Sequence, residues 1–128
     1  RKKLLRIIYQ HLKPGGKLLL DVFSKETFDS FREGQTWESC PSGGFWREHS
    51  YIALSGHYKY QDLITLEQTT IISDAEIATY YIWNTCFTQN SLIEEVKKSG
   101  FNVSGIFENV AGEKSHQNSP TIAILLEK

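Results

Sequence analysis

Methionine is absent from this 128-residue sequence, and cysteine occurs only twice. Because translation begins at methionine, we expect that Arg1 is not the natural start of the protein. Cys40 and Cys86 are too few and too far apart for a disulfide framework or a zinc site. We therefore expect no bound metal, reduced thiols and a cytoplasmic location.

Strong net charge and long apolar runs are also missing. The formal net charge is -1, so the chain lacks the basic field by which proteins attract nucleic acids or anionic membranes. No apolar run approaches the roughly 20 residues that a membrane-spanning helix requires. We expect a globular chain whose partners are neither nucleic acids nor membranes.

The first 23 residues predict a helix, a turn and a strand. Apolar residues recur at helical spacing at Leu4, Leu5, Ile8 and Leu12. Pro14 and the two following glycines then end this helix, because proline cannot continue it and glycine adopts the dihedral angles of a helix exit. Residues 18–23 are apolar on both faces, as in a strand buried between helices, which predicts an α/β fold.

The middle of the chain changes to the two-residue period of exposed strands. Residues 24–45 are polar and irregular, apart from a short helical turn at 27–31. Segments 46–59, 63–73 and 76–87 then alternate, so we expect a three-stranded antiparallel meander over residues 46–87.

The last third of the chain returns to the α/β pattern. Thr88 is a typical N-cap, and the helix that it starts should end at Gly100. Strands are expected at 102–107 and at 121–126, the second again apolar on both faces. We therefore expect a single domain over residues 1–128 that carries the meander as an insertion.

Three segments in this order resemble class I S-adenosylmethionine (SAM)-dependent methyltransferases. Residues 3–21, with the Pro14-Gly15-Gly16 turn, are similar to the part of that family that leads into its fifth strand. Residues 88–101 resemble its last helix, and residues 119–127 its seventh strand, which lies antiparallel between strands six and five. The resemblance implies a partial Rossmann-like sheet of strands 5, 7 and 6 with helices.

The resemblance also implies that the cofactor-binding half is missing here. In that family a glycine-rich loop after the first strand holds SAM, well before the fifth strand, whereas only one short helix precedes Pro14. Gly15-Gly16 and Gly43-Gly44 each precede a strand, which is the wrong order for a cofactor loop. We therefore expect the carboxyl half of a methyltransferase, which uses SAM in its full-length parent but binds no cofactor alone and is inactive alone.

The meander occupies the place where this family often inserts substrate-binding structure. The resemblance therefore implies a substrate-side lid over a small-molecule acceptor, although no catalytic residue can be assigned. The aromatic and basic side chains expected to contact the substrate are Trp46, Arg47, His49, Tyr58, Tyr60, Tyr81 and Trp83. The same aromatic residues are also favoured in strands simply because they pack well there.

A second interpretation is a non-enzymatic ligand-binding or dimerisation module that uses the aromatic meander. Under either interpretation, residues 18–23 lack the neighbour that the family's fifth strand has on one side. An open, apolar strand edge invites pairing with another chain. We therefore expect a homodimer, formed through this edge or through the meander.

Overall fold

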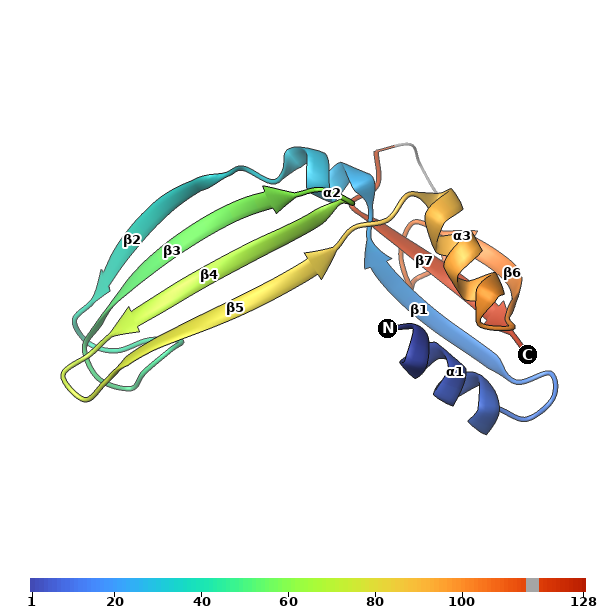
Figure 1. The fold of residues 1–128 in the computed structure, drawn as a ribbon, viewed down its shortest axis with the longest axis horizontal. Coiled ribbons are helices and arrows are strands. Elements are labelled where there is room, and N and C mark those ends of the chain that lie inside the picture. The colour runs from blue at the N-terminus through green and yellow to red at the C-terminus, as the bar shows by residue number, and fades with distance from the viewer. Residues whose placement is uncertain (115–117) are drawn as a thin grey trace. The chain divides into compact units, whose positions relative to one another are not determined.

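The computed structural model describes residues 1–114 and 118–128, and the chain divides into two compact units (Figure 1). The first unit comprises Arg1–Asp29 and Cys86–Lys128, and the second comprises Ser30–Thr85. The second unit is therefore inserted into the sequence of the first.

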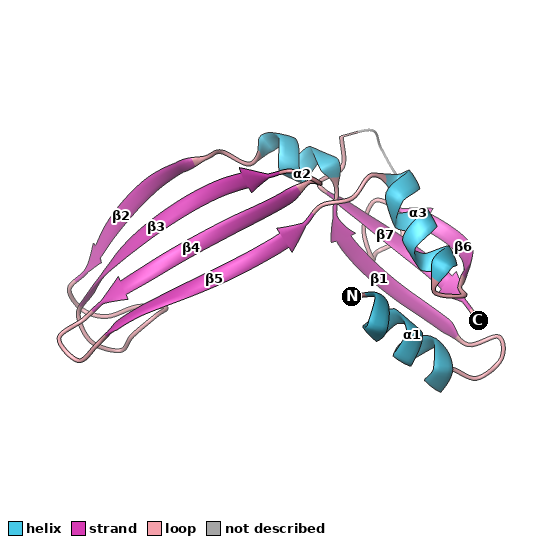
Figure 2. Ribbon diagram, viewed as in Figure 1, coloured by secondary structure: helices cyan, strands magenta, loops and turns pink. Residues whose placement is uncertain are grey.

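The first unit contains a three-stranded sheet with the order β1-β7-β6 (Figure 2). β1 (Lys17–Phe23) and β6 (Asn102–Phe107) both pair antiparallel with the central β7 (Thr121–Glu127). This order confirms the expected arrangement of strands 5, 7 and 6. It also leaves β1 with β7 as its single neighbour within the described sheet.

Two helices cover one face of this sheet. Leu5 of α1 (Lys2–His11) and Val96 of α3 (Gln89–Lys98) belong to the same buried cluster as Ile124 and Leu126 of β7. Burial of these apolar side chains is the main contribution to the stability of the unit.

The two faces of β1 differ in burial, although both were expected to be covered. Leu18, Leu20 and Val22 pack against the helix-covered cluster. On the other face Leu19 and Phe23 are exposed by 46% and 45%. The difference arises because α1 and α3 both pack on the same side of the sheet.

The ends of α3 follow the expected pattern. The hydroxyl of Thr88 accepts a hydrogen bond from the Ser91 N–H at 3.1 Å, and the Ser91 hydroxyl accepts one from the Thr88 N–H at 3.1 Å. This reciprocal capping box satisfies two N–H groups at the start of the helix. At the other end Gly100 has a φ of 100°, which is the left-handed conformation that glycine adopts readily after a helix.

The segments by which the chain leaves and re-enters the first unit are hydrogen-bonded to each other. Ser24, which follows β1, forms a parallel bridge with Phe87, which precedes α3. The Phe87 N–H donates to the Phe23 carbonyl at 2.8 Å, and the Lys25 N–H donates to the Phe87 carbonyl at 2.8 Å. Lys25 is the first residue of the short helix α2 (Lys25–Ser30).

The second unit is a four-stranded antiparallel sheet with the order β2-β3-β4-β5. Its strands are β2 (Gly34–Cys40), β3 (Tyr51–Tyr60), β4 (Ile64–Ile72) and β5 (Ile77–Thr85). The last three agree with the expected meander.

Two details of this sheet differ from the expectation. β2 lies in a segment predicted to be irregular, and residues 46–50 form no strand. β2 was missed because Gly34–Ser39 are all exposed on an edge strand, which therefore carries no alternation of apolar and polar residues.

Candidate functional site

Four of the seven expected substrate contacts share one face of the four-stranded sheet, and the other three lie in the connection between β2 and β3. Directly paired residues of neighbouring strands share a face. Tyr58 pairs with Leu66, which pairs with Trp83, and Gln68 likewise pairs with Tyr81. Tyr58, Tyr60, Tyr81 and Trp83 therefore share a face with Leu54, which we call the Leu54 face. We call the other, which carries Tyr51, Ala53 and Ile71, the Ile71 face.

Trp46 lies against the Ile71 face. Residues 41–50 connect β2 to β3, and Trp46 packs against the buried cluster of Tyr51, Ala53 and Ile71. Its indole stacks on the ring of Tyr80, with a centroid distance of 4.8 Å and an interplanar angle of 27°. This side chain therefore anchors the connection to the sheet.

Arg47 is held beside this stack by three groups. Its guanidinium donates to the Tyr80 hydroxyl at 3.0 Å, to the Glu76 carboxylate at 2.5 Å and to the Trp46 carbonyl at 2.6 Å. The hydrogen bond to Tyr80, and after it the one to Glu76, raises the pKa of Arg47 above its ordinary value. These contacts fix the position of a cation at the rim of the second unit.

A hollow of about 440 Å³ lies next to Arg47. It is lined by residues 47–50 and 73–76, and therefore includes His49 as well as Arg47. Glu48, Asp74 and Glu76 contribute carboxylates to the same lining. Because guanidinium groups donate hydrogen bonds, carboxylates accept them and imidazole can do either, the hollow suits a small ligand with both amine and hydroxyl groups.

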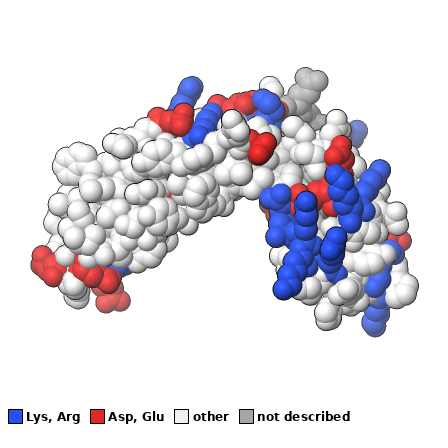
Figure 3. All heavy atoms as spheres, in the orientation of Figure 1, with Lys and Arg blue, Asp and Glu red and all other residues white. Residues whose placement is uncertain are grey.

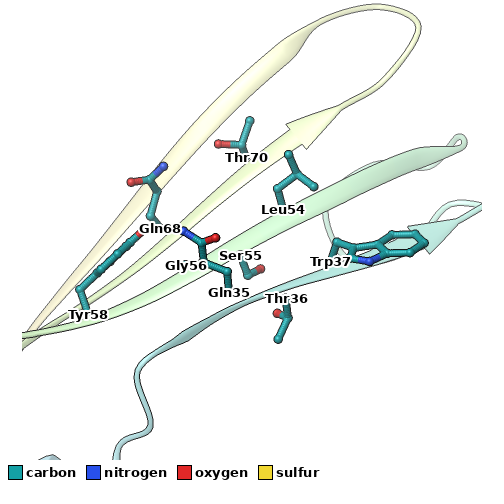
Figure 4. Close-up of a pocket in the computed structure, with 9 residues that line it drawn as sticks. All are labelled: Gln35, Thr36, Trp37, Leu54, Ser55, Gly56, Tyr58, Gln68 and Thr70. Carbon is teal, nitrogen blue, oxygen red and sulfur yellow. The ribbon is translucent and has the colours of Figure 1, made fainter.

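A second hollow, of about 360 Å³, lies on the sheet itself between β2, β3 and β4 (Figure 4). The ring of Tyr58 leans over Gly56, where an added Cβ would lie only 2.5 Å from the tyrosine hydroxyl. The residues that line this hollow, none of them charged, are Gln35, Thr36, Trp37, Leu54, Ser55, Gly56, Tyr58, Gln68 and Thr70.

Sequence reasoning missed Trp37, which lines this second hollow. Its side chain is 71% exposed, and it lies on the edge strand that carries no alternation. A tryptophan in an otherwise polar segment was itself a usable signal, because aromatic residues outside the core mark binding surfaces. On the same face Tyr60 and Trp83 contact each other, with ring centroids 5.3 Å apart.

The first unit has an apolar pocket of about 230 Å³ between α1, α3 and β1. Leu5, Ile8, Leu18 and Leu92 are among the residues that line it. Arg1 and Glu95 line it too and form an ion pair with each other. No expected substrate contact lies in this pocket.

Neither a cluster of metal ligands nor a membrane-spanning helix occurs among residues 1–114 and 118–128. These residues contain no group of three or more His, Cys, Asp or Glu side chains placed to hold a metal ion. None of the helices described is long and apolar enough to cross a bilayer.

Solved structures with the same arrangement of elements identify the fold. The chain superposes on a SAM-dependent methyltransferase from Clostridium acetobutylicum ATCC 824 with a TM-score of 0.72 and 12% identity, over 98% of this chain and 50% of that one. The chain has the fold of SAM-dependent methyltransferases. The CcbJ methyltransferase from Streptomyces caelestis gives a TM-score of 0.64 at 11% identity, over 98% of this chain and 51% of that one.

A third methyltransferase structure agrees. The sugar N-methyltransferase KedS8 from Streptoalloteichus sp ATCC 53650 matches with a TM-score of 0.54 and 14% identity, over 96% of this chain and 47% of its own. The chain thus spans about half the length of the methyltransferases that it matches. No family sequence model and no curated protein matches the sequence.

These matches confirm the methyltransferase resemblance and the Rossmann-like α/β class at the level of fold. The inserted antiparallel sheet lies within the matched region, because the match to the Clostridium protein covers 98% of this chain. Sequence identities of 11–14% carry no further information on substrate or activity.

Proposed function

We propose that this chain is the acceptor-binding half of a SAM-dependent methyltransferase that acts on a small molecule. The observation that carries the proposal is the match of 98% of the chain to half of a solved SAM-dependent methyltransferase, with a TM-score of 0.72. The sheet order β1-β7-β6 supports it, because the resemblance implied this order for strands 5, 7 and 6.

In such an enzyme, bound SAM supplies an activated methyl group. Transfer of that group is an in-line displacement, so the protein's main task is to hold the acceptor in line and to keep water out. Under this proposal the second unit performs that task for the parent enzyme. The glycine-rich loop that holds SAM belongs to the other half of the parent, so this chain alone binds no cofactor and transfers no methyl group.

The hollow beside Arg47 and His49 is the proposed acceptor contact. Trp46 adds an aromatic surface next to it, and the pairing of Arg47 with Glu76 and Tyr80 fixes the cation before any ligand binds. A preorganised group of this kind costs little conformational entropy on binding. KedS8 is named as a sugar N-methyltransferase, and an amino sugar has the amine and hydroxyl groups that such a hollow suits.

Two further proposals accompany this one. Two cysteines in 128 residues are too few for a disulfide framework, which supports a reducing compartment such as the cytoplasm. We also propose that the protein is a homodimer. The alternative function, a non-enzymatic ligand-binding or dimerisation module, predicts the dimer but no methyl transfer.

The test uses the protein produced from the complete reading frame that contains this chain. Calorimetry should show SAM binding by that protein and none by the 128-residue chain. With an amino sugar as acceptor, formation of S-adenosylhomocysteine should be detectable. Absence of SAM binding by the complete protein would leave the non-enzymatic module as the better interpretation.

A pair of variants locates the acceptor contact. His49→Ala should raise the KM for the acceptor and leave SAM affinity unchanged, because His49 lines the hollow. Gln61→Ala, in the exposed turn between β3 and β4, is the matched control and should change neither value. Equal KM values for the two variants would place the acceptor elsewhere.

A further inference from the structure

The Leu54 face of the four-stranded sheet contains no charged residue. By strand register it consists of the odd-numbered positions of β2 and β5 and the even-numbered positions of β3 and β4. No Lys, Arg, Asp, Glu or His occurs at any of these positions. The Ile71 face, in contrast, carries Glu38, Lys59 and Glu67. Figure 3 shows a broad surface without Lys, Arg, Asp or Glu over the strands of this sheet.

Large apolar side chains are exposed across the Leu54 face. Trp37 and Ile77 are each 71% exposed, Tyr81 and Trp83 are each 58% exposed, and Leu54 is 43% exposed. These residues come from β2, β3 and β5, so the apolar surface extends over the whole width of the sheet. Several large apolar side chains exposed on one uncharged face mark an interaction site.

The size of the face suits a protein partner. The four strands have seven to ten residues each. At about 3.3 Å per residue and about 4.8 Å between strands, they span on the order of 600 Å². Two such faces in contact bury about 1,200 Å², which reaches the size of a stable protein–protein interface. The absence of charge argues against a nucleic acid or an anionic lipid surface as the partner.

The face is also complementary to itself. It carries protruding side chains, such as Ile77 and Tyr81 on β5, and it carries the hollow of about 360 Å³ between β2, β3 and β4. In a symmetric dimer the same surface patch serves both copies, so one patch must supply both the protrusion and the recess. A two-fold axis along the strands places β5 of one copy over β2 of the other, which brings Tyr81 towards the recess beside Trp37.

We propose that two copies of this chain pack their Leu54 faces together as a two-sheet sandwich. Sheets that stack face to face lie about 10 Å apart with their strands roughly aligned, and their inner side chains interdigitate. Tyr60, Tyr81 and Trp83 are then interface residues rather than substrate contacts. The proposal does not depend on methyl transfer, because it rests only on this face.

Two neighbouring residues of β5 provide a matched test. Tyr81 lies on the Leu54 face and Ile82 on the Ile71 face, and their side chains are 58% and 49% exposed. Light scattering of the complete protein should give the mass of a dimer for the wild type and for Ile82→Arg. Tyr81→Arg should weaken the dimer about 30-fold or more, because an arginine buried in an uncharged interface lacks a partner.

Two further measurements check that the variants fold and that the Leu54 face is covered in the dimer. Circular dichroism should show the same spectrum for both variants, and Leu54→Lys should reproduce the effect of Tyr81→Arg if the latter fails to fold. Trp37 and Trp83 lie on this face, so acrylamide should quench wild-type tryptophan fluorescence more strongly once dilution separates the dimer.

Three results would overturn the proposal. If the wild type stays monomeric at high concentration, no second copy covers the Leu54 face. This holds even if another part of the complete protein covers it. A dimer that persists in Tyr81→Arg but is lost in Ile82→Arg would place the interface on the Ile71 face. A Tyr81→Arg variant that remains dimeric and changes only the acceptor KM would assign Tyr81 to the substrate.

Discussion

The indole of Trp46 stacks on the phenol ring of Tyr80, with ring centroids 4.8 Å apart. Trp46 belongs to the connection between β2 and β3, whereas Tyr80 lies on β5 at the opposite edge of the sheet. The stack therefore joins segments that are distant in sequence, and it holds the connection over the Ile71 face. Arg47 and the hollow beside it depend on this anchoring.

The stack should appear as an energetic coupling between the two residues. In a double-mutant cycle of Trp46→Ala and Tyr80→Ala, we expect a coupling of about 0.5–1.5 kcal/mol, as for other aromatic pairs. Urea unfolding would measure it. Tyr80→Phe separates the ring contact from the hydrogen bond with Arg47, and should retain most of the coupling to Trp46. Additive effects of the two alanine changes would show that the stack contributes no stability.

The tight turn at Gly43 should not tolerate a side chain. Gly43 has a φ of 80°, and an added Cβ would lie 2.2 Å from the Glu48 carbonyl oxygen. Gly43→Ala should therefore destabilise the second unit by more than about 1–2 kcal/mol, the cost of the left-handed conformation alone. Gly34→Ala is the matched control, because no atom lies within 4 Å of its added Cβ.

The readout for these glycine variants is tryptophan fluorescence during urea unfolding. Trp37, Trp46 and Trp83 all lie in the second unit, so the signal reports on that unit and not on the first. Similar midpoints for Gly43→Ala and Gly34→Ala would mean that the connection relaxes without cost.

The N-cap of α3 should contribute measurably to the first unit. Thr88→Ala removes the hydroxyl that accepts the Ser91 N–H, and we expect a loss of about 1 kcal/mol. Asn90→Ala, at an exposed position in the first turn of the same helix, is the control and should be close to neutral or slightly stabilising. Hydrogen exchange of the α3 amides would compare the two variants. Equal protection of the α3 amides in both variants would mean that water replaces the hydrogen bond of the Thr88 side chain.

Tyr51 should make the stability of the second unit depend on alkaline pH. A hydrogen bond with Cys40, together with burial, raises the pKa of Tyr51 above its ordinary value. The pKa of Tyr51 in the folded protein exceeds the value of about 10 in the unfolded chain. The contribution of Tyr51 to the free energy of unfolding is therefore fully present below that value and is lost as the pH rises through the folded pKa. Tyr51→Phe should remove this part of the pH dependence.

Tyrosinate absorbance during a pH titration would measure this shift. The difference between the wild type and Tyr51→Phe isolates the titration of Tyr51. Cys40→Ala should move that titration back towards the ordinary value, because the hydrogen bond with Cys40 is the largest cause of the shift. A difference titration centred at the ordinary pKa would contradict the prediction.

Local patterns were sufficient to predict the helices and the main strands of the first unit. Pro14 and the glycines after it marked the end of α1, Thr88 marked the start of α3, and continuous apolar runs marked β1 and β7. These signals are strong because each depends on a few residues whose dihedral angles or hydrogen bonds are restricted. The pairing of β1 and β6 with β7 came from the family resemblance, since no local pattern specifies strand order.

The second unit was predicted less completely, for two physical reasons. An exposed edge strand such as β2 has no buried side and therefore no alternation to detect. Alternation along β5 also separates Tyr80 from Tyr81, but only the register with β4 shows which residues of other strands share each face. Trp46 was expected to lie on a strand, because nothing in its neighbours indicates that residues 41–50 fold back over the sheet.

The bridge between Ser24 and Phe87 has a consequence for how this fold diversifies. The bridge joins the backbone shortly before residue 30 and shortly after residue 85, so the inserted segment begins and ends close to one hydrogen-bonded pair of segments in the first unit. A sheet of another size, or with another surface, can be inserted beside this bridge without a change in the strand register of β1, β7 and β6. The surface that the inserted unit presents can therefore change while the three-stranded sheet keeps its hydrogen bonds.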